Sequence, residues 1–326
     1  MVHYTMIRMQ DMPEDILMFS IVIPLYNKAA TVERAINSVL NQTVQDYEIV
    51  VVNDGSTDKG PDVVEQINDS RIRLIVQTNQ GVSVARNRGI AEAKHELIAF
   101  LDADDEWMPE FLETIRRMIL NHPACALYAT RYFLRAPSGK QQPAIVRSLM
   151  NDFEGSIDNY FEIAANSNPP VWTSATCVRK TALEKIGGFP VGVKSGEDLL
   201  TWARLAVRFK VSYSMACLSI FYQTTAETCD TIPSRVPADD DVVGRGLADL
   251  LNGVENSMKK YLRSYCALWH KMRASCYLRL GMRTNARNEI IKALHYSISL
   301  TLIVYWILSF SPGFTIQKAF HLGSSN

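Results

Sequence analysis

The sequence predicts an α/β fold with a mixed, mainly parallel sheet flanked by helices and followed by a helical C-terminal extension. Two observations predict it. Short apolar runs alternate with amphipathic segments over the first 121 residues, and the chain after residue 245 is basic and helical in pattern. The 326 residues are enough for roughly two domains, or for one large domain with appended elements.

The composition is that of an ordinary globular protein. Hydrophobic residues make up 47% of the chain and charged residues 21%. These values exclude a disordered chain, a collagen-like fibre and a polytopic membrane protein.

Four strands and four helices are expected in the N-terminal third. The strands are apolar or β-branched runs that end at Pro24 or at turn-rich sequence, and the first helix shows apolar residues at positions i, i+3, i+4, i+7 and i+8. Pro61 also favours the start of a helix, because proline fits the first helical turn. The expected strands are residues 19–23, 47–52, 71–76 and 96–101, and the expected helices are 32–40, 61–68, 82–94 and 109–121.

Repeated β-α-β units of this spacing predict a parallel sheet with helices on both sides. Ligands of such sheets bind beyond the carboxyl ends of the strands. The polar segments that follow residues 23, 52 and 101 are therefore expected to meet at one edge of the sheet.

The pattern after residue 123 is more mixed. Expected strands are 124–133, 171–178 and 211–215, expected helices are 157–165 and 198–208, and helical sequence continues from 246 to about 310. The predicted organisation is an N-terminal extension (1–18), a main domain (19–225), a Thr-, Asp- and Pro-rich linker (226–245) and a basic helical extension (246–326).

The formal net charge is zero, which argues against a nucleic-acid-binding protein. The charges are nevertheless segregated, because residues 256–326 carry ten basic residues and one acidic residue. Residues 293–317 carry no Asp, Glu, Lys or Arg, but their apolar part is shorter than a spanning helix needs. A peripheral helix on an anionic membrane is expected, and a buried C-terminal helix is the alternative. If the C-terminal region forms a peripheral membrane helix, removal of residues 256–326 is expected to release the protein from membranes.

The six cysteines form no C-x-x-C pair. The first 17 residues include three carboxylates and have no apolar core of a leader peptide. We therefore expect reduced thiols and a cytoplasmic protein, placed at the inner face of the cell membrane by its C-terminal region.

An acidic cluster follows the fourth expected strand. Asp102, Asp104 and Asp105 lie within four positions, where carboxylates repel one another unless a cation is present. Mg²⁺ and Mn²⁺ take oxygen ligands and are shared with substrate phosphates. The alternative is a solvated acidic loop that precedes the next helix.

Three further positions carry candidate chemistry. Asp54, after the second strand, can accept hydrogen bonds from a ribose or a base edge, although a simple turn is the alternative. Arg86 can pair with phosphate oxygens. Glu197 and Asp198 open a helix, where acidic residues commonly complement the helix dipole. The chain has no G-x-G-x-x-G after its first strand, which argues against an NAD-type Rossmann site, and the absence of a P-loop sequence excludes that nucleotide site.

Five segments, in their order and spacing, resemble the family-2 glycosyltransferases. These are inverting enzymes of the GT-A fold that use nucleotide-activated sugars. The resemblance covers about residues 19–225, and its segments are 19–27 (FSIVIPLYN), 53–58 (NDGSTD), 81–89 (GVSVARNRG), 101–105 (LDADD) and 196–198 (GED).

The resemblance implies a nucleotide pocket lined by Pro24, Tyr26 and Asn27. It also implies that Asp54 binds the uracil or the ribose, and that Arg86 lies near the nucleotide diphosphate.

The remaining roles concern the metal and the acceptor. By resemblance, Asp104 ligates Mn²⁺ or Mg²⁺, and Asp102 holds the ribose or a metal-bound water. Asp198 matches the catalytic base, and Glu197 helps to orient the acceptor. No His between residues 200 and 245 offers a third metal ligand, so the diphosphate and water are left to complete the shell.

The expected function is metal-dependent, inverting transfer of a sugar from a nucleotide-sugar donor, here a UDP-sugar, to a hydroxyl of a glycan or lipid-linked acceptor, as in surface polysaccharide biosynthesis. Two alternatives remain. One is a non-catalytic nucleotide-sugar-binding or scaffold subunit of the same fold. The other is a nucleotidyltransferase, which needs a glycine- and lysine-rich loop in place of residues 24–28 (PLYNK).

Overall fold

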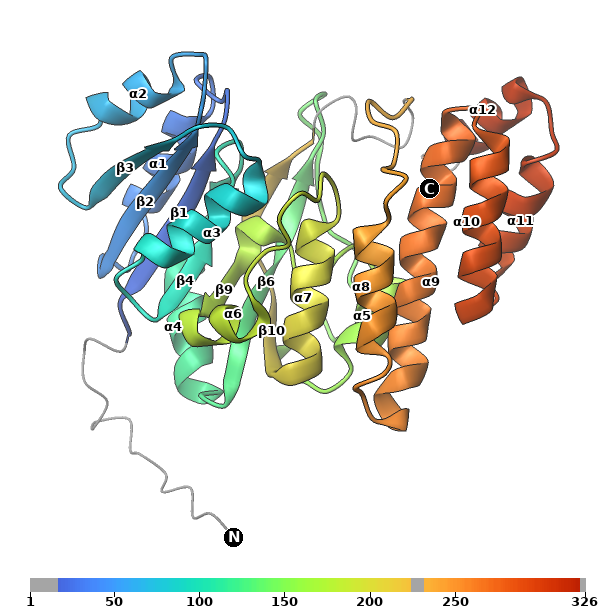
Figure 1. The fold of residues 1–326 in the computed structure, drawn as a ribbon. Helices are drawn as coiled ribbons and strands as arrows, with labels where there is room; N and C mark the ends of the chain where they lie inside the picture. The colour runs from blue at the N-terminus through green and yellow to red at the C-terminus, as the bar shows by residue number, and fades with distance from the viewer. Residues whose placement is uncertain (1–16, 224–231, 323–326) are drawn as a thin grey trace, which may run out of the picture.

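The computed structural model describes residues 17–223 and 232–322. In this part of the chain, one ten-stranded mixed sheet has helices on both faces, and a group of C-terminal helices stands beside it (Figure 1). The predicted fold class is confirmed. The expected N-terminal extension and residues 226–231 of the expected linker lie outside the described residues, apart from positions 17 and 18.

The N-terminal half of the sheet is parallel, as predicted. Strand β1 pairs in parallel with β2 and β4, and β2 pairs in parallel with β3. The order across the sheet is β3-β2-β1-β4-β9-β6-β10-β5, with β7 beside β6 and β8 beside β10. The strands are β1 (Phe19–Leu25), β2 (Tyr47–Asp54), β3 (Ile72–Gln77), β4 (Leu97–Phe100), β5 (Glu106–Trp107), β6 (Cys125–Arg135), β7 (Gln141–Pro143), β8 (Glu154–Ile157), β9 (Thr176–Arg179) and β10 (Lys210–Tyr222).

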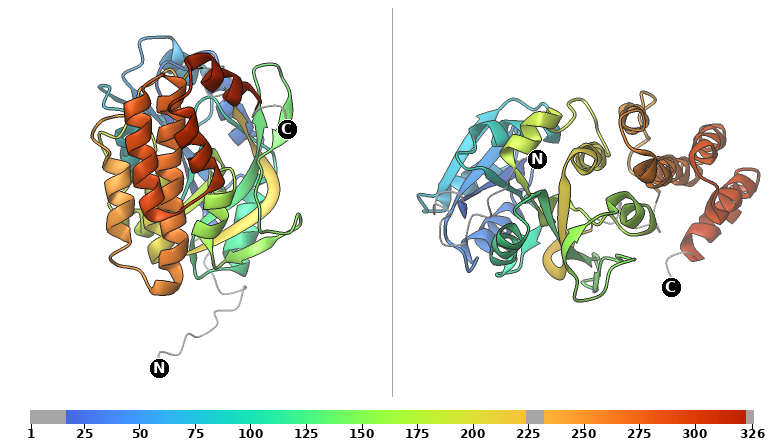
Figure 2. Two further views of the ribbon diagram at one scale, coloured as in Figure 1. Left: turned by 90° about the vertical axis from the view of Figure 1, so that its right-hand side faces the viewer. Right: turned by 90° about the horizontal axis from the view of Figure 1, so that it is seen from below.

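The helices cover the two faces and then extend to one side of the sheet (Figure 2). They are α1 (Val32–Leu40), α2 (Gly60–Gln66), α3 (Val82–Glu92), α4 (Phe111–Asn121), α5 (Tyr160–Asn166), α6 (Lys180–Ile186), α7 (Glu197–Arg208), α8 (Val242–Leu250), α9 (Asn256–Arg279), α10 (Arg283–Tyr296), α11 (Leu300–Leu308) and α12 (Gly313–Leu322).

Successive residues of β1 serve opposite faces of the sheet, as the two-residue period of a strand requires. Phe19, Ile21 and Ile23 pack in one core with α1 and α4, while Val22 packs in the other core with Trp202 of α7. All four apolar side chains are fully buried. The sheet is thus held from both sides, which fixes the loops at its carboxyl edge.

Helix α9 belongs to the core of the main domain. Its residues Leu262, Tyr265, Cys266 and Trp269 are buried in the same cluster as Trp202. Removal of residues 256–326 would therefore take away part of that core, and it does not isolate membrane attachment from folding.

The prediction of one strand is wrong over its first half. Residues 171–178 were expected to be extended throughout, but Thr173–Ala175 form a short 3-10 helix and β9 begins at Thr176. The turn closes because the Ala175 N–H and the Thr176 hydroxyl both donate to the Trp172 carbonyl, at 2.9 and 2.6 Å. Apolar and β-branched residues favour strands, but this local bonding outweighs that preference.

The apolar C-terminal segment forms α11, and a further helix, α12, follows where the sequence indicated an end near residue 310. Among the described residues, no helix has both the length and the hydropathy needed to cross a bilayer.

Candidate active site

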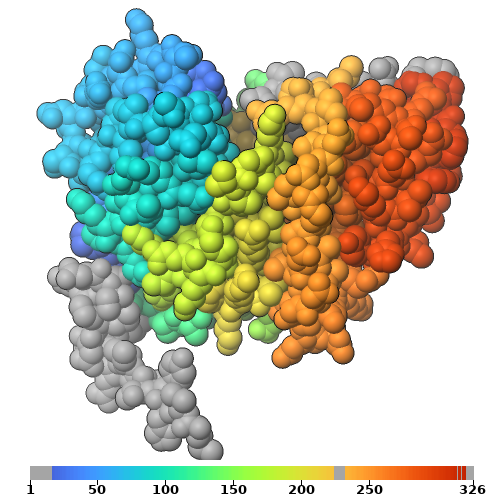
Figure 3. All heavy atoms as spheres, in the orientation of Figure 1, coloured from blue at the N-terminus to red at the C-terminus, as the bar shows by residue number. Residues whose placement is uncertain are grey.

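A cavity of about 720 Å³ lies where the strands β1, β2 and β4 end. Its walls include predicted site residues from four separate segments, which confirms that the polar loops meet at one edge of the sheet. The molecule is visibly hollowed between its N-terminal half and the yellow and orange segments (Figure 3). The predicted residues in the cavity lining are Pro24, Tyr26, Asp54, Arg86, Asp102 and Asp104.

Asp54 ends β2 and is buried. Its carboxylate accepts hydrogen bonds from the Gln77 side chain and from the backbone N–H groups of Gln80 and Gly81, at 2.8, 2.9 and 2.8 Å. Gln80 and Gly81 form part of the cavity wall. Asp54 therefore shapes the wall by holding the loop that precedes α3.

Asn27 is not part of the cavity lining, unlike its predicted neighbours Pro24 and Tyr26. It lies in the left-handed region, at φ 52°, and its side-chain oxygen accepts a hydrogen bond from the Thr57 N–H at 2.8 Å. It joins the loop after β1 to the turn after β2. Tyr26, half-exposed, is part of the cavity lining.

Arg86, on α3, connects the cavity with the start of α7. Its guanidinium donates to Asp102 Oδ1 at 2.8 Å and to Glu197 Oε1 at 3.1 Å, and its side chain is only 5% exposed. Burial acts to lower the pKa of Arg86, but the two carboxylates outweigh it and hold the pKa above its ordinary value. The charge of Arg86 is thereby fixed between the two predicted catalytic segments.

The three carboxylates after β4 occupy different environments. Burial raises the pKa of Asp102, against the opposing effect of Arg86. Asp104 pairs with the Lys28 ammonium at the cavity. Burial raises the pKa of Asp105 well above its ordinary value, and the charges of Asp102 and Asp104 add to this. Of the three, Asp102 and Asp104 line the cavity and are placed to offer oxygen ligands to a cation there.

Glu197 and Asp198 are the first residues of α7. Burial raises the pKa of Asp198 to about 7, the neighbouring Glu197 carboxylate adds to the rise, and Arg86 opposes it. A carboxylate with a pKa near the working pH is well suited to general-base catalysis. The cavity lining does not include either residue. Arg86, which is part of the lining, pairs with Glu197 and acts on Asp198 through its charge.

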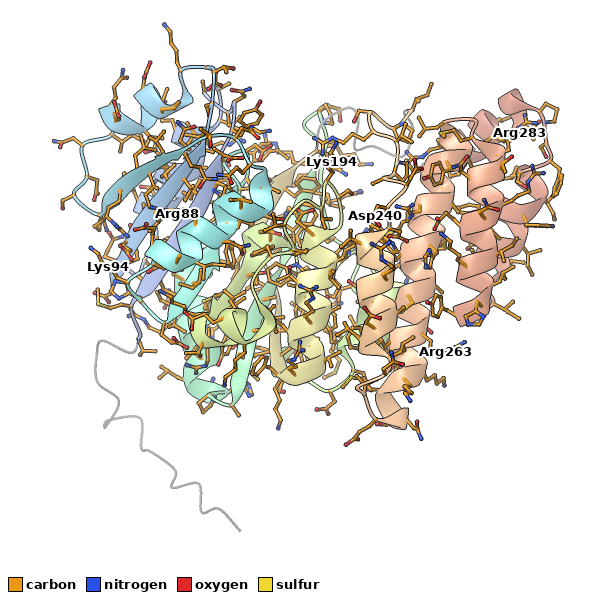
Figure 4. The ribbon with its side chains drawn as sticks, viewed as in Figure 1. Arg88, Lys94, Lys194, Asp240, Arg263 and Arg283 are labelled. Atoms are coloured by element: carbon orange, nitrogen blue, oxygen red, sulfur yellow. The ribbon has the colours of Figure 1, made fainter. Side chains whose placement is uncertain are left out.

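Three cationic residues of the cavity were not predicted as site residues from the sequence. Lys28 follows the conspicuous segment 19–27 directly, so its position could have been noticed. Lys194 and Arg235 carry no such signal, and they reach the cavity from the loop before α7 and from the segment before α8. Figure 4 shows Lys194 on that loop.

A second group of potential metal ligands lies outside the cavity lining, on the C-terminal helices. Asp241, His270 and Glu289 offer atoms within 4.8 Å of one another. Arg273 Nε lies 3.2 Å from Glu289 Oε2, and Lys292 Nζ lies 2.9 Å from Glu289 Oε1. Cationic side chains already balance these carboxylates, which is the arrangement of a buried ion network.

A protein-family model described as "Glycosyl transferase family 2" matches residues 20–184, half of the chain. The chain belongs to glycosyltransferase family 2. The resemblance and the enzyme class inferred from the sequence are confirmed at the level of the family. The match contains Asp54, Arg86, Asp102 and Asp104 and ends before α7.

Relatives within family 2 are similar over limited segments. An uncharacterised glycosyltransferase of Nostoc sp. is 50% identical over 99 residues, 29% of this chain and 31% of the relative. The putative teichuronic acid biosynthesis glycosyltransferase TuaG of Bacillus subtilis is 35% identical over 123 residues, 37% of this chain and 48% of that protein. The aligned segment thus spans less than half of either family-2 relative.

Solved structures match over nearly the whole chain. Residues 1–349 of TarS from S. aureus superpose with a TM-score of 0.67 at 20% identity, covering 94% of this chain and 92% of that one. A complex of the same TarS fragment with UDP-GlcNAc gives a TM-score of 0.64 at 18% identity, with the same coverage. At these identities the likeness establishes the fold alone, and it confirms the expected GT-A architecture of this family-2 chain.

Proposed function

We propose that this chain transfers a sugar from a UDP-sugar to an acceptor hydroxyl with inversion at the anomeric carbon. The observation that carries the proposal is an electrostatic link: Arg86, in the lining of a nucleotide-sized cavity, acts through its charge on Asp198, a partly buried carboxylate whose pKa is about 7. The UDP-GlcNAc complex of TarS supports a UDP-sugar as the donor.

The reaction follows from this arrangement. Asp198 accepts the proton of the acceptor hydroxyl as its oxygen attacks the anomeric carbon. The bond from that carbon to the diphosphate oxygen breaks, and UDP leaves with the bonding electron pair. A single displacement with one base inverts the anomeric centre. Lys28, Lys194 and Arg235 supply positive charge around the cavity, where the diphosphate would lie.

The test is UDP release by the purified full chain, measured with a panel of UDP-sugars in the presence of Mn²⁺. Release above the uncatalysed rate with at least one donor is expected. Binding of UDP without any release would instead identify a non-catalytic nucleotide-sugar-binding subunit.

The proposed reaction includes a divalent metal held by Asp104 and Asp102. Both carboxylates line the cavity, which supports this part of the proposal, and Lys28 lies beside Asp104 as its counter-charge. Bound Mn²⁺ or Mg²⁺ would neutralise charge that develops on the leaving diphosphate.

Substitution Asp104→Asn tests the metal site. Loss of one carboxylate ligand is expected to lower Mn²⁺-dependent UDP release by about 10²-fold, since metal stabilisation of leaving-group charge is worth several kcal/mol. Calorimetry should also show that Mn²⁺ no longer strengthens UDP binding. The control is Glu110→Gln, an exposed residue near the same loop. Full Mn²⁺ dependence in Asp104→Asn would contradict the assignment.

The proposed acceptor is a glycan or a lipid-linked glycan at the inner face of the cell membrane, as in surface polysaccharide synthesis. The name of TuaG supports a polysaccharide context.

The exposed face of the C-terminal helices supports membrane contact, because apolar side chains are exposed there and Arg287 lies 4.9 Å from the ring centre of Phe310. Basic groups beside an exposed apolar face suit an anionic bilayer surface. The exposed side chains are Ile291, Ile298, Leu300, Ile303, Val304, Trp306, Ile307 and Phe310.

Membrane contact is tested with the double substitution Ile303→Glu and Ile307→Glu, at positions 47% and 61% exposed. Binding to phosphatidylglycerol vesicles, measured by co-sedimentation, should fall about tenfold or more, since burial of each Ile in lipid contributes roughly 1.5–3 kcal/mol at most. The control is Met150→Glu, an exposed apolar residue outside these helices. Equal loss in both variants, or no loss in the double variant, would refute the membrane surface.

A further inference from the structure

The turn that leads into α7 is packed against a side chain of α9. Gly196 precedes Glu197 and has φ +81°, a backbone conformation that favours glycine. A Cβ atom placed on Gly196 would lie 2.5 Å from Cζ3 of Trp269. The indole ring therefore lies directly on the backbone from which Glu197 and Asp198 project.

Trp269 is itself held in place. It is buried, and its indole Nε1 donates to Asp241 Oδ1 at 2.9 Å. The same Asp241 oxygen accepts the Gly244 N–H at 2.9 Å and so caps the start of α8. The ring is thereby fixed by the junction of α8 and α9, of which α8 lies alongside α7 (Figure 1).

The buried ion network continues this support into α10. His270 Nδ1 lies 2.7 Å from Glu289 Oε2, and Arg273 Nε lies 3.2 Å from the same oxygen and 3.7 Å from Asp241 Oδ2. Buried carboxylates and guanidinium groups are costly unless they are paired, so loss of one member disturbs the others. The network therefore ties Asp241, and through it Trp269, to three helices.

Helix α9 also supplies part of the surroundings of Asp198. Burial raises the pKa of Tyr265, one turn before Trp269, and the charge of Asp198 contributes to the rise. The ring of Tyr265 packs against Tyr160 of α5, with ring centres 6.2 Å apart. The groups that act electrostatically on Asp198 are Arg86 of α3, Glu197 of α7 and Asp102 in the loop after β4. The charge of Asp198 acts in turn on Tyr132 of β6, Tyr160 of α5 and Tyr265 of α9.

We propose that Trp269 is a positioning residue for the catalytic base: by packing on Gly196 from a ring anchored to Asp241, it fixes the orientation of Asp198. The C-terminal helices α8 and α9 are then part of the catalytic apparatus and serve more than attachment to a membrane. The inference rests on the proposed function, in which Asp198 is the base.

The experiment compares Trp269→Leu with the unmodified chain in UDP release from UDP-N-acetylglucosamine or another UDP-sugar that the panel identifies. We expect kcat to fall at least about tenfold while the Kd for UDP, measured by calorimetry, stays within about twofold, because the cavity lining does not include Trp269. Trp269→Phe, which keeps an aromatic ring facing Gly196, should recover part of kcat. A shift of the acid limb of the pH–rate profile is expected in Trp269→Leu, because the surroundings of Asp198 change.

The matched control is Tyr277→Leu, a buried aromatic residue two turns further along α9 that packs with Ile316 of α12. It should lose a comparable amount of stability and keep kcat and the pH profile. Equal losses of kcat in Trp269→Leu and Tyr277→Leu, or an unchanged kcat and pH profile in Trp269→Leu, would overturn the proposal.

If Trp269→Leu does not fold, Gly196→Ala alters the same contact from the other side. It is expected to lower kcat with UDP affinity retained, and an unchanged kcat there would also overturn the proposal. Absence of UDP release by the unmodified chain would overturn the proposed function, and this inference with it.

Discussion

Substitution of Asp198 by Asn is expected to lower sugar transfer by about 10²–10⁴-fold, the usual contribution of a positioned general base. The amide keeps the shape of the side chain but cannot accept the acceptor proton. UDP binding should be unchanged, because the cavity lining does not include Asp198. The loss is therefore expected in kcat, measured as UDP release and as product formed.

The pH dependence gives a second test of the same residue. The pKa of Asp198 is about 7, since burial and the neighbouring Glu197 carboxylate raise it. A base acts in its deprotonated form, so kcat should fall as the pH drops below about 7 and level off above it. Asn at this position has no titrating group, and the acid limb near pH 7 should be absent from its residual activity.

Asp158→Asn is the control for this substitution, because it makes the same chemical change at an exposed position before α5. It should leave transfer and the pH profile unaltered. Undiminished transfer in Asp198→Asn would remove this residue from the role of base, and the search would pass to Glu197, its neighbour at the start of α7.

The carboxyl edge of the sheet could be predicted because its information is local. The apolar runs that become β1 and β2 are ended by turn residues, and parallel pairing of β1 with β2 and β4 brings the residues after them together. Asp54 and Asp102 follow in sequence from the ends of these strands. Their meeting at one cavity needs only the topology and no knowledge of side-chain packing.

The C-terminal part of the site could not be predicted in this way. Trp269 meets Gly196 across more than seventy residues, and Arg235 reaches the cavity from a segment that the sequence marks only as a linker. Such contacts depend on how helices pack, which hydrophobic periodicity does not specify. The basic composition of residues 256–326 indicated a membrane surface, but it concealed that one face of α9 is buried in the main core.

Substitution of Arg86 by Met is expected to lower both stability and activity. The guanidinium is 5% exposed and pairs with Asp102 at 2.8 Å and Glu197 at 3.1 Å. Met replaces its length but leaves two partly buried carboxylates without a counter-charge, so the free energy of unfolding should fall by about 3 kcal/mol. Chemical denaturation measures this loss. Arg86→Lys keeps the charge without the two-pronged geometry and should restore part of it.

The control for Arg86→Met lies on the same helix. Arg88 pairs with Glu92 one turn away, and its side chain is 53% exposed (Figure 4). Exposed pairs of this kind contribute only about 0.3–0.5 kcal/mol, so Arg88→Met should leave stability nearly unchanged. A similar loss in the two variants would show that Arg86 has no special place in the site.

The activity of Arg86→Met should depend on pH in a characteristic way. Arg86 lowers the pKa of Asp198, so its removal raises that pKa further above about 7. At pH 7 Asp198 would then be mostly protonated and unable to act as a base. Transfer should therefore be lost more completely at pH 7 than at pH 9, with the acid limb of kcat displaced upward. An acid limb that stays where it lies in the unmodified chain would show that Arg86 does not set the charge of Asp198, and would confine Arg86 to holding the fold.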